Sequence, residues 1–206
     1  MAVVEVRDVH KSFRIPEVRR DTVREHVLAA LRPRPFQDLK VLEGVSFELR
    51  RGEALGVMGR NGCGKSTLLK ILTGIYRPDR GRVVRRAPLT PILELGVGWN
   101  RELDAVDNIE LMGTAMGLGL GELRRMRRDI LGFAGLERFA RLELKHYSSG
   151  MAARLAFAVA LAAVREVLVL DEVFAVGDAA FRDRCKERLR DLHAAGHAIL
   201  LVSHNP

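Results

Sequence analysis

A glycine-rich segment that ends in lysine and serine carries the clearest chemistry in this sequence. Residues 59–66 fit the pattern G-x-x-x-x-G-K-[ST] and lie between an apolar run and a helical pattern. Glycines at this spacing let backbone N–H groups curl into a nest for an anion, and the following helix adds its positive end. The sequence therefore predicts a loop that binds the phosphates of a nucleoside triphosphate. The predicted nucleotide-binding residues of this loop are Gly59, Arg60, Asn61, Gly62, Cys63, Gly64, Lys65, Ser66 and Thr67.

Five side chains have separate predicted roles in the chemistry of that nucleotide. Lys65 would reach the β- and γ-phosphates, the Ser66 hydroxyl would bind Mg²⁺, and Thr67 would contact the α-phosphate. Asp171 directly follows an apolar strand pattern, where it would hold Mg²⁺ through water. Glu172 comes next and would polarise the attacking water as a general base. An acid pair after an apolar run is equally typical of a solvated turn, but the phosphate loop favours the catalytic interpretation.

Alternating apolar strands and helices would position these groups. The predicted strands are 3–9, 41–49, 54–58, 167–170 and 198–202, and the last three have the apolar character of buried strands. The predicted helices are 65–73, 151–164 and 180–193, and residues 104–141 are helical in pieces, broken at Gly117–Gly119–Gly121 and Gly132–Gly135. This order predicts an α/β fold with a mostly parallel sheet covered on both sides. We expect one domain over residues 1–206, with a helical subdomain at about 97–163.

Composition limits the class of protein. The 206 residues are 48% hydrophobic and 29% charged, which excludes a disordered chain and is typical of one globular domain. The longest apolar run, residues 155–164, is too short to cross a membrane, and Glu5 and Arg7 interrupt any signal peptide. Cys63 and Cys185 are too few and too far apart in sequence for a metal cluster or a disulfide framework, so we expect two free thiols.

A Ser-Ser-Gly segment before the apolar helix is a second candidate phosphate contact. Residues 147–151 read Tyr-Ser-Ser-Gly-Met, and a serine hydroxyl with a glycine N–H at a helix N-terminus suits a γ-phosphate, although the segment alone is better explained as an N-cap. It resembles the L-S-G-G-Q signature of the ATP-binding cassette (ABC) family. Asp178 and His204 follow Glu172 at the spacings of that family's D-loop aspartate and switch histidine. Phe13 falls where an aromatic ring stacks on adenine, so the resemblance covers essentially the whole chain.

The resemblance implies a P-loop NTPase fold of the ABC type, with an antiparallel β subdomain beside the parallel core sheet and the helical subdomain. It implies ATP and Mg²⁺ as cofactors, with Lys65, Glu172 and His204 as catalytic residues. Two chains would sandwich two ATP molecules in a head-to-tail homodimer, and each signature segment would complete the site of the partner protomer. The residues expected to act in this way are Ser148, Ser149, Gly150 and Met151, with Asp178 in the D-loop.

The motif variants are similar to one branch of the family, whose members are ATPase subunits that export lipid-linked polysaccharides such as O-antigen, capsule and teichoic acid. The similarity rests on the segment 147–151, on Ala-Val-Gly-Asp-Ala at 175–179, on Leu-Glu-Leu-Gly at 93–96 and on a basic helix inserted at 17–36. It implies a separate integral-membrane permease as partner and a lipid-linked glycan as the cargo of the complex. The chain would then lie at the cytoplasmic face of the inner or plasma membrane, attached through the permease.

Two departures from the family pattern bear on these expectations. The Q-loop glutamine is missing, because Leu95 stands at its position, and Glu94 beside it is the candidate substitute ligand for Mg²⁺. The stretch 94–108, which includes Trp99, is where the family contacts its permease, although Trp99 is equally explained by packing. The chain also stops two residues after His204, where family members continue, so we expect an incomplete cassette.

Several alternatives stay open from the sequence. The basic helix at 17–36 is either a solvated surface helix or an element near the permease, where its arginines meet phospholipid or the pyrophosphate of the glycan lipid. The motor residues fit an ABC ATPase for another cargo, a lipid or a drug, equally well. A soluble ABC ATPase acting on nucleic acid or the ribosome is supported only by the net charge of +8. Because 28 of the 34 basic residues are arginines, that charge indicates genome composition, and we expect no nucleic-acid partner.

Overall fold

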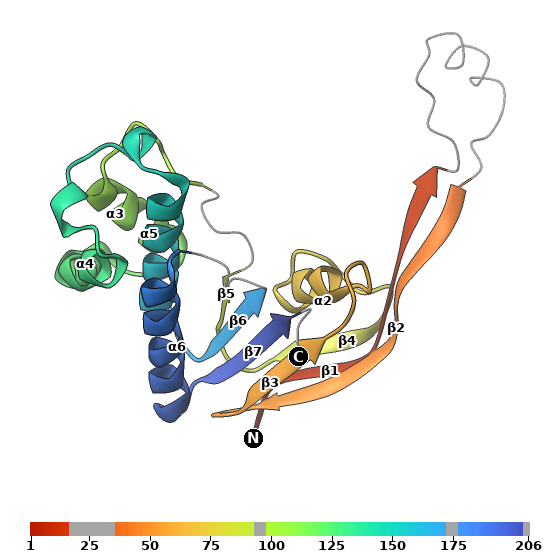
Figure 1. Ribbon diagram of the computed structural model, residues 1–206. Helices are drawn as coiled ribbons and strands as arrows, with labels where there is room; N and C mark the ends of the chain where they lie inside the picture. The colour runs from red at the N-terminus through yellow and green to blue at the C-terminus, as the bar shows by residue number, and fades with distance from the viewer. Residues whose placement is uncertain (17–35, 93–97, 172–176, 204–206) are drawn as a thin grey trace, which may run out of the picture. The chain divides into compact units, whose positions relative to one another are not determined.

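The computed structural model describes residues 1–16, 36–92, 98–171 and 177–203 (Figure 1). Residues 17–35 of the expected inserted helix lie outside the described residues, and so do Glu94, Glu172 and His204. The chain divides into two compact units. The first comprises Met1–Val4, Glu48–Arg60 and Arg85–Pro206, and the second comprises Glu5–Phe47 and Asn61–Val84.

A four-stranded parallel sheet forms the centre of the first unit. Its strands lie in the order β3-β7-β6-β5, and their bounds are Ala54–Met58 for β3, Ala198–Ser203 for β7, Val167–Asp171 for β6 and Leu89–Ile92 for β5. In this register Met58 pairs with Ser203, and Asp171 pairs with Val202. The carboxyl ends of β3, β6 and β7 therefore meet at one edge of the sheet, which is where ligands bind in parallel α/β folds. The expected mostly parallel core sheet is confirmed.

Strands β6 and β3 are both expected to be buried, but they differ in the exposure of their side chains. Residues 167–170 of β6 are at most 1% exposed, because β5 and β7 flank this strand on both sides. Strand β3 alternates between exposed and half-buried positions, and Met58 is 63% exposed. The expectation of a buried β3 is wrong for the described residues, in which β3 is an edge strand paired only with β7.

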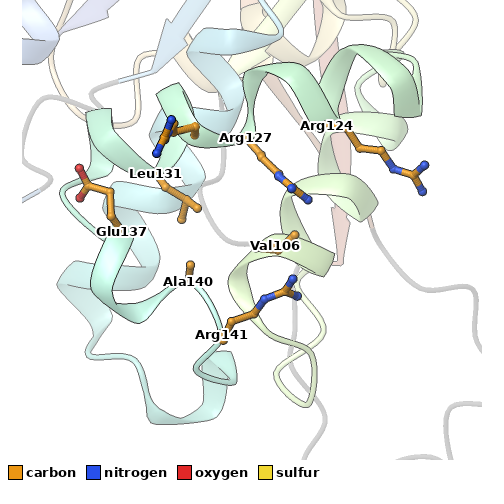
Figure 2. A pocket seen from close by; sticks show the side chains of 8 residues that line it. Val106, Arg124, Arg127, Leu131, Glu137, Ala140 and Arg141 are labelled. Atoms are coloured by element: carbon orange, nitrogen blue, oxygen red, sulfur yellow. The ribbon is translucent and has the colours of Figure 1, made fainter.

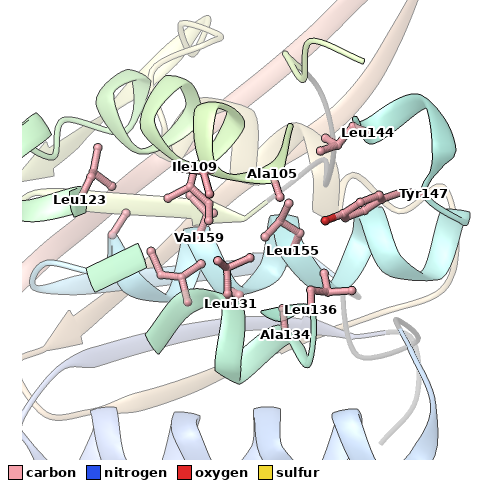
Figure 3. Packing of buried hydrophobic residues seen from close by; sticks show 14 of the residues in the cluster. Ala105, Ile109, Leu123, Leu131, Ala134, Leu136, Leu144, Tyr147, Leu155 and Val159 are labelled. Carbon is pink, nitrogen blue, oxygen red and sulfur yellow. The ribbon is translucent and has the colours of Figure 1, made fainter. Parts of the chain in front are cut away.

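Three helices and two short 3-10 turns build the helical part of the first unit. The helices are α3 (Ala105–Ala115), α4 (Leu120–Ala134) and α5 (Ser149–Ala162), and the turns are η1 (Glu137–Phe139) and η2 (Leu144–His146). Their buried side chains converge on one apolar cluster, to which α3 contributes Ala105 and Ile109 and α5 contributes Leu155 and Val159 (Figure 3). These helices thus share one apolar core.

The chain leaves its helices at both groups of glycines, as expected: α3 ends at Ala115, and α4 lies between its N-cap Gly119 and its C-cap Gly135. Gly121 and Gly132 both lie inside the helix, and the chain leaves it only at Gly135, which caps the C-terminus in the left-handed conformation at φ 66°. Leu123, Ile130, Leu131 and Ala134 share one buried face of the helix. Burial of that face outweighs the cost of about 1 kcal/mol for each interior glycine.

Helix α5 connects two apolar clusters. Leu155, Ala158 and Val159 belong to the cluster of the helical part, while Phe157, Ala160 and Leu161 pack with the sheet and with α6 (Ala179–Ala194). The central residue of the second cluster is Phe181 of α6, whose ring lies edge-to-face against Phe157 at a centroid distance of 6.2 Å. Such a helix must be apolar all round, as its sequence is.

Three strands form an antiparallel sheet in the order β2-β1-β4, with bounds Phe36–Arg50 for β2, Ala2–Pro16 for β1 and Arg80–Arg85 for β4. Strands β1 and β2 run further than the apolar patterns at 3–9 and 41–49. Strands β4 and β5 are not expected from the sequence, because β4 is largely arginine and glycine and β5 is a four-residue strand that contains Pro91. Helix α2 (Lys65–Leu72) lies in the second unit. No helix among the described residues is long and apolar enough to span the membrane.

Candidate nucleotide-binding site

The phosphate loop ends in a glycine that the backbone requires. Gly64 is the N-cap of α2 and adopts the left-handed conformation at φ 99° and ψ 4°. A Cβ at this position would lie 2.8 Å from the carbonyl oxygen of Val41 and 2.9 Å from the Cδ2 atom of Leu42. Any other residue would therefore be both strained in its backbone and overlapped with β2.

The N-terminus of α2 has no side-chain cap. Since Gly64 has no side chain, the N-cap supplies no hydrogen bond to the N–H groups of the first turn, and no acidic residue lies in that turn. Uncapped N–H groups together with the helix dipole attract an anion. Lys65 is buried at 9% exposure, Ser66 is exposed and Thr67 is half-buried. This helix end has the local features of a phosphate site.

Phe13 packs beside an aromatic residue that the sequence analysis does not single out. The ring centroids of Phe13 and Tyr76 are 5.6 Å apart in an edge-to-face arrangement, and Lys70 Nζ of α2 lies 5.8 Å from the Tyr76 ring. The backbone N–H of Tyr76 also donates to the Lys70 carbonyl oxygen at 2.9 Å. Phe13, Tyr76 and helix α2 are therefore packed together within the second unit. The sequence does not predict the contact between Phe13 and Tyr76, because a single aromatic residue after Gly74 is too weak a signal.

A carboxylate fastens the end of β1 to the segment after α2. Asp79 accepts hydrogen bonds from Lys11 Nζ at 2.7 Å, from the Ser12 backbone N–H at 2.6 Å and from the Ser12 hydroxyl at 2.9 Å. These bonds, the one from Lys11 foremost, lower the pKa of Asp79 to about 2. The ionised carboxylate thus holds Lys11 and Ser12, the two residues of β1 that precede Phe13.

Asp171 ends the buried strand β6 and is half-buried. Its place at the carboxyl edge of the parallel sheet follows from its pairing with Val202 of β7. Glu172 and His204 come directly after the described ends of β6 and β7. The structure thus describes the strands that lead to these two residues, and the residues themselves lie outside its described part.

The signature segment is a well-formed helix start. Ser148 is the N-cap of α5, and its hydroxyl accepts from the Met151 backbone N–H at 3.2 Å. Ser149 is exposed, while Gly150 and Met151 are half-buried. Tyr147 is buried, and its hydroxyl donates to the Phe139 carbonyl oxygen at 2.7 Å; burial raises the pKa of Tyr147 to about 12. The simple N-cap interpretation is therefore correct as far as the fold of this chain is concerned.

Gly150 does not owe its identity to the packing of its own chain. A Cβ at Gly150 would meet no atom nearer than the Ser148 hydroxyl at 4.0 Å, and its φ is not in the left-handed region. The contrast with Gly64 is clear, because a Cβ at Gly150 would meet its nearest neighbour only at an ordinary van der Waals distance. An exposed serine and a glycine with no obstruction at its Cβ position leave the N-terminus of α5 accessible from outside the chain.

Asp178 connects α6 to the signature helix. Its side chain caps α6 by accepting from the Phe181 N–H at 2.8 Å, and its Oδ2 lies 3.8 Å from Arg154 Nη1 of α5. Gly177 before it adopts φ 77°, and its carbonyl oxygen accepts from Arg182 at 2.9 Å. Arg154 and Arg182 are contacts that sequence reasoning missed, since arginines are too abundant in this chain for any one of them to stand out.

The two cysteines of the chain are both described by the structure. Cys63 is exposed in the phosphate loop and Cys185 is buried in α6, and both are free thiols. Burial raises the pKa of the Cys185 thiol to about 11. No cluster of three or more His, Cys, Asp or Glu side chains suited to a metal ion occurs within the described ranges.

Comparison with known proteins places the chain in a family. The sequence model of the ABC transporter family matches residues 42–175. The chain belongs to the ABC transporter family. Its ABC fold is also that of a solved structure described as the ATP-binding subunit of an ABC transporter, with a TM-score of 0.77, 27% sequence identity and coverage of 98% of this chain and 80% of that one.

Two ABC relatives of this chain are named for export. The O-antigen export system ATP-binding protein RfbB of Klebsiella pneumoniae is 41% identical over 177 residues, which cover 84% of this chain and 72% of RfbB. The teichoic acids export ATP-binding protein TagH of Bacillus cereus is 36% identical over 164 residues, which cover 80% of this chain and 30% of TagH. The chain spans between 30% and 75% of the length of the curated ABC relatives compared, and about half of several of them.

Proposed function

We propose that this chain is the ATP-binding and ATP-hydrolysing subunit of an exporter that moves a lipid-linked polysaccharide through a separate integral-membrane permease. The observation that carries the ATP-binding part is the left-handed Gly64 followed by an uncapped helix N-terminus. The export part rests on membership of the ABC transporter family and on relatives that are named for O-antigen and teichoic acid export.

The phosphates would bind along residues 59–67, with backbone N–H groups of the loop and of α2 as donors. Lys65 would contact the β- and γ-phosphates, and Thr67 would contact the α-phosphate. The adenine would stack on Phe13, whose ring is held by Tyr76 and Lys11. Most of the affinity for ATP would then come from residues of the second unit.

The Mg²⁺ of the nucleotide has suitable donors in this chain. The exposed hydroxyl of Ser66 and the half-buried carboxylate of Asp171 offer the oxygen ligands that Mg²⁺ prefers, and Asp171 acts through water. Bound Mg²⁺ neutralises charge on the β- and γ-phosphates. Glu94 is the further candidate ligand in place of the absent glutamine.

Hydrolysis would depend on positioning and electrostatics. Glu172 would orient the attacking water and take its proton, and His204 would stabilise the γ-phosphate during attack. Both residues follow directly from strands β6 and β7, whose carboxyl ends share one edge of the parallel sheet. The water would therefore approach from the side of the sheet on which the phosphate loop leaves β3.

The complete site would need a second copy of the chain. Ser148, Ser149, Gly150 and Met151 would face the γ-phosphate bound by the partner protomer. The unobstructed Cβ position at Gly150 supports this role, since the fold of one chain does not require a glycine there. ATP would hold the two protomers together, and its hydrolysis would let them separate, which is the mechanical output toward the permease.

The proposed cargo and location are supported by the named export functions of the relatives and by the motif variants, because the ATPase residues do not distinguish one cargo from another. A lipid-linked glycan on the cytoplasmic leaflet would be the cargo, and the chain would be held at the cytoplasmic face of the membrane by its permease. The basic segment 17–36, of which 17–35 lie outside the described residues, is the proposed element near that leaflet.

Inactivating the gene in its source tests the cargo directly. We expect lipid-linked glycan to accumulate in the cytoplasmic leaflet and the surface polysaccharide to disappear, and a plasmid carrying the wild-type gene to reverse both effects. A Lys65→Ala copy should fail to reverse them. A normal surface with no accumulated glycan lipid would overturn the export assignment while leaving the nucleotide chemistry to be judged by binding.

A further inference from the structure

A pocket lined by arginines lies in the helical part of the first unit, within a single unit and apart from the residues assigned to ATP. Its volume is about 530 Å³, which falls in the range of small-molecule sites. Figure 2 shows Arg124 and Arg127 of α4 at the upper right, Leu131 beside Glu137 at the left, and Arg141 below. Its lining also includes Val106, Arg128 and Ala140.

The arginines of α4 reach this pocket because of their spacing. Arg124, Arg127, Arg128 and Leu131 follow the i, i+3, i+4, i+7 pattern of one helical face. Arg125 lies between them in sequence and does not line the pocket. The pocket thus gathers only the arginines of one face of an arginine-rich helix, beside an apolar floor that includes Val106 and Ala140.

Two of the four arginines are held in place by carboxylates. Arg124 Nε lies 3.3 Å from Glu110 Oε1 of α3, and Arg141 Nη1 lies 3.1 Å from Asp104 Oδ2 at the N-cap of the same helix. These pairs orient the guanidinium groups and offset their charge. Within the described residues, the side chains of Arg127 and Arg128 form neither an ion pair nor a hydrogen bond, and Glu137 is the only acidic side chain in the lining.

The other described pockets lack this character. A pocket of about 350 Å³ between α4, α5 and α6 is lined by one arginine, Arg188, opposed by Asp129. A pocket of about 290 Å³ against the parallel sheet is mainly apolar, with Arg190 and His193 as its basic residues. The high arginine content of the chain therefore does not by itself explain the four arginines of this pocket, because the other two pockets do not share them.

We propose that this pocket binds a small phosphate-bearing anion of about pyrophosphate size, at a site separate from the ATP site. Guanidinium groups donate paired hydrogen bonds that match the oxygens of a phosphate, and a phosphate can accept from several of them at once. Arg127 and Arg128 supply the donors that the protein leaves unused, and the oriented Arg124 and Arg141 supply further charge. The phosphate belongs either to a soluble anion or to a lipid headgroup.

Titration with inorganic pyrophosphate tests the site. It is performed by calorimetry on the full chain carrying Lys65→Ala, so that binding at the phosphate loop does not mask the pocket. We expect Arg127→Gln with Arg128→Gln to weaken binding by about tenfold or more, because each lost charged hydrogen bond is worth roughly 1.5 kcal/mol or more. The matched control is Arg125→Gln with Arg138→Gln, which removes the same charge outside the lining and should leave the affinity nearly unchanged.

A charge change of opposite sign sharpens the test. Glu137→Gln removes the only acidic side chain of the lining and should tighten pyrophosphate binding, which a purely structural role for the arginines does not predict. All of these side chains are exposed, so the melting temperatures of the variants should match their Lys65→Ala parent. Equal loss of binding in the pocket and control variants, or no pyrophosphate binding at all, would overturn the proposal.

The source of the phosphate is distinguished by a second arm with vesicles. Co-sedimentation with phosphatidylcholine vesicles that contain phosphatidic acid is compared with phosphatidylcholine alone. Binding that Arg127→Gln with Arg128→Gln removes would assign the pocket to a lipid phosphate. Pyrophosphate binding without vesicle binding would assign it to a soluble anion. Failure of this proposal leaves the ATP site untouched, because no residue of the pocket belongs to it.

Discussion

Two helix N-termini in this protein are candidates for contact with ATP phosphates, α2 with the ATP of its own chain and α5 with that of the partner, and they are built in opposite ways. Helix α2 starts at Gly64, a left-handed glycine with no side chain to cap it, whereas α5 starts at Ser148, whose hydroxyl caps the helix itself. The N-cap of the first end supplies no side-chain hydrogen bond, and a helix end of this kind suits the phosphates of a nucleotide bound by its own chain. The second is satisfied without a ligand and is stable in a free protomer. We infer that α2 binds the ATP of its own chain. Helix α5 contacts ATP only when a second protomer with bound ATP associates with it.

The glycines at the two helix ends differ in whether the fold of the chain requires a glycine. At Gly64 it does, because a side chain would overlap Val41 and Leu42. At Gly150 it does not, because a Cβ there would overlap no atom of the chain. A substitution at the first should therefore damage the protomer, and one at the second should damage only what approaches from outside. The predictions below test this contrast.

The largest effect is expected at the phosphate loop. Gly64→Ala should abolish measurable ATP binding and destabilise the protein by about 1–3 kcal/mol, since it forces a left-handed residue and a backbone overlap. Fluorescent ATP titration and urea unfolding measure the two effects. Gly62→Ala is the control, because Gly62 has φ 81° but no atom within 4 Å of its Cβ position, so only the milder strain applies. Equal stability for Gly64→Ala and wild type would contradict the geometry.

At the signature helix, Gly150→Val should separate stability from assembly. A Cβ at this position would overlap no atom of the chain, so the free energy of unfolding should change by only about 0.5 kcal/mol. ATP binding by the protomer should persist, whereas the ATP-dependent dimer should be lost on size-exclusion chromatography. A dimer that forms as readily as in wild type would remove Gly150 from the interface.

Ser148→Ala should produce an intermediate effect. Loss of the hydrogen bond from Met151 N–H should cost about 1 kcal/mol of stability, which is typical of an N-cap. The same change removes the hydroxyl offered to the partner's γ-phosphate, so dimer formation should also weaken. Ser148→Asp restores the cap but adds a negative charge, and it should recover stability without recovering the dimer. Recovery of both would mean that Ser148 acts only as a cap.

The smallest effect concerns pH and the support of Phe13. The lowered pKa of Asp79 means that the ionised carboxylate stabilises the folded protein. This contribution is complete above the unfolded value of about 3.9 and is lost as the pH falls toward 2. In urea unfolding, wild type should be more stable than Asp79→Asn at pH 5 to 7, and the difference should shrink below pH 4. A constant difference across this range would show that the charge is not responsible.

The sequence predicts local features of this protein better than its pairings. The bounds of β3 and the start of α2 follow from the apolar run and the loop motif, but the edge position of β3 depends on which strands surround it. The two groups of glycines correctly predict where α4 begins and ends, at Gly119 and Gly135. Strand β4 carries no apolar pattern. At the candidate site, spacing identifies Lys65, Ser66 and Asp171, whereas the contact between Phe13 and Tyr76 joins distant segments and leaves no signal in the sequence.

The central claim, that α2 binds ATP in one protomer and α5 completes the site from the other, is tested most directly by mixing two defective chains. Both carry Glu172→Gln to prevent hydrolysis; one also carries Lys65→Ala, and the other carries Gly150→Val. Light scattering with Mg-ATP should find each variant alone to be monomeric and the mixture to contain a dimer, because the mixture has one intact site. A mixture that stays monomeric, or a dimer of either variant alone, would contradict the account.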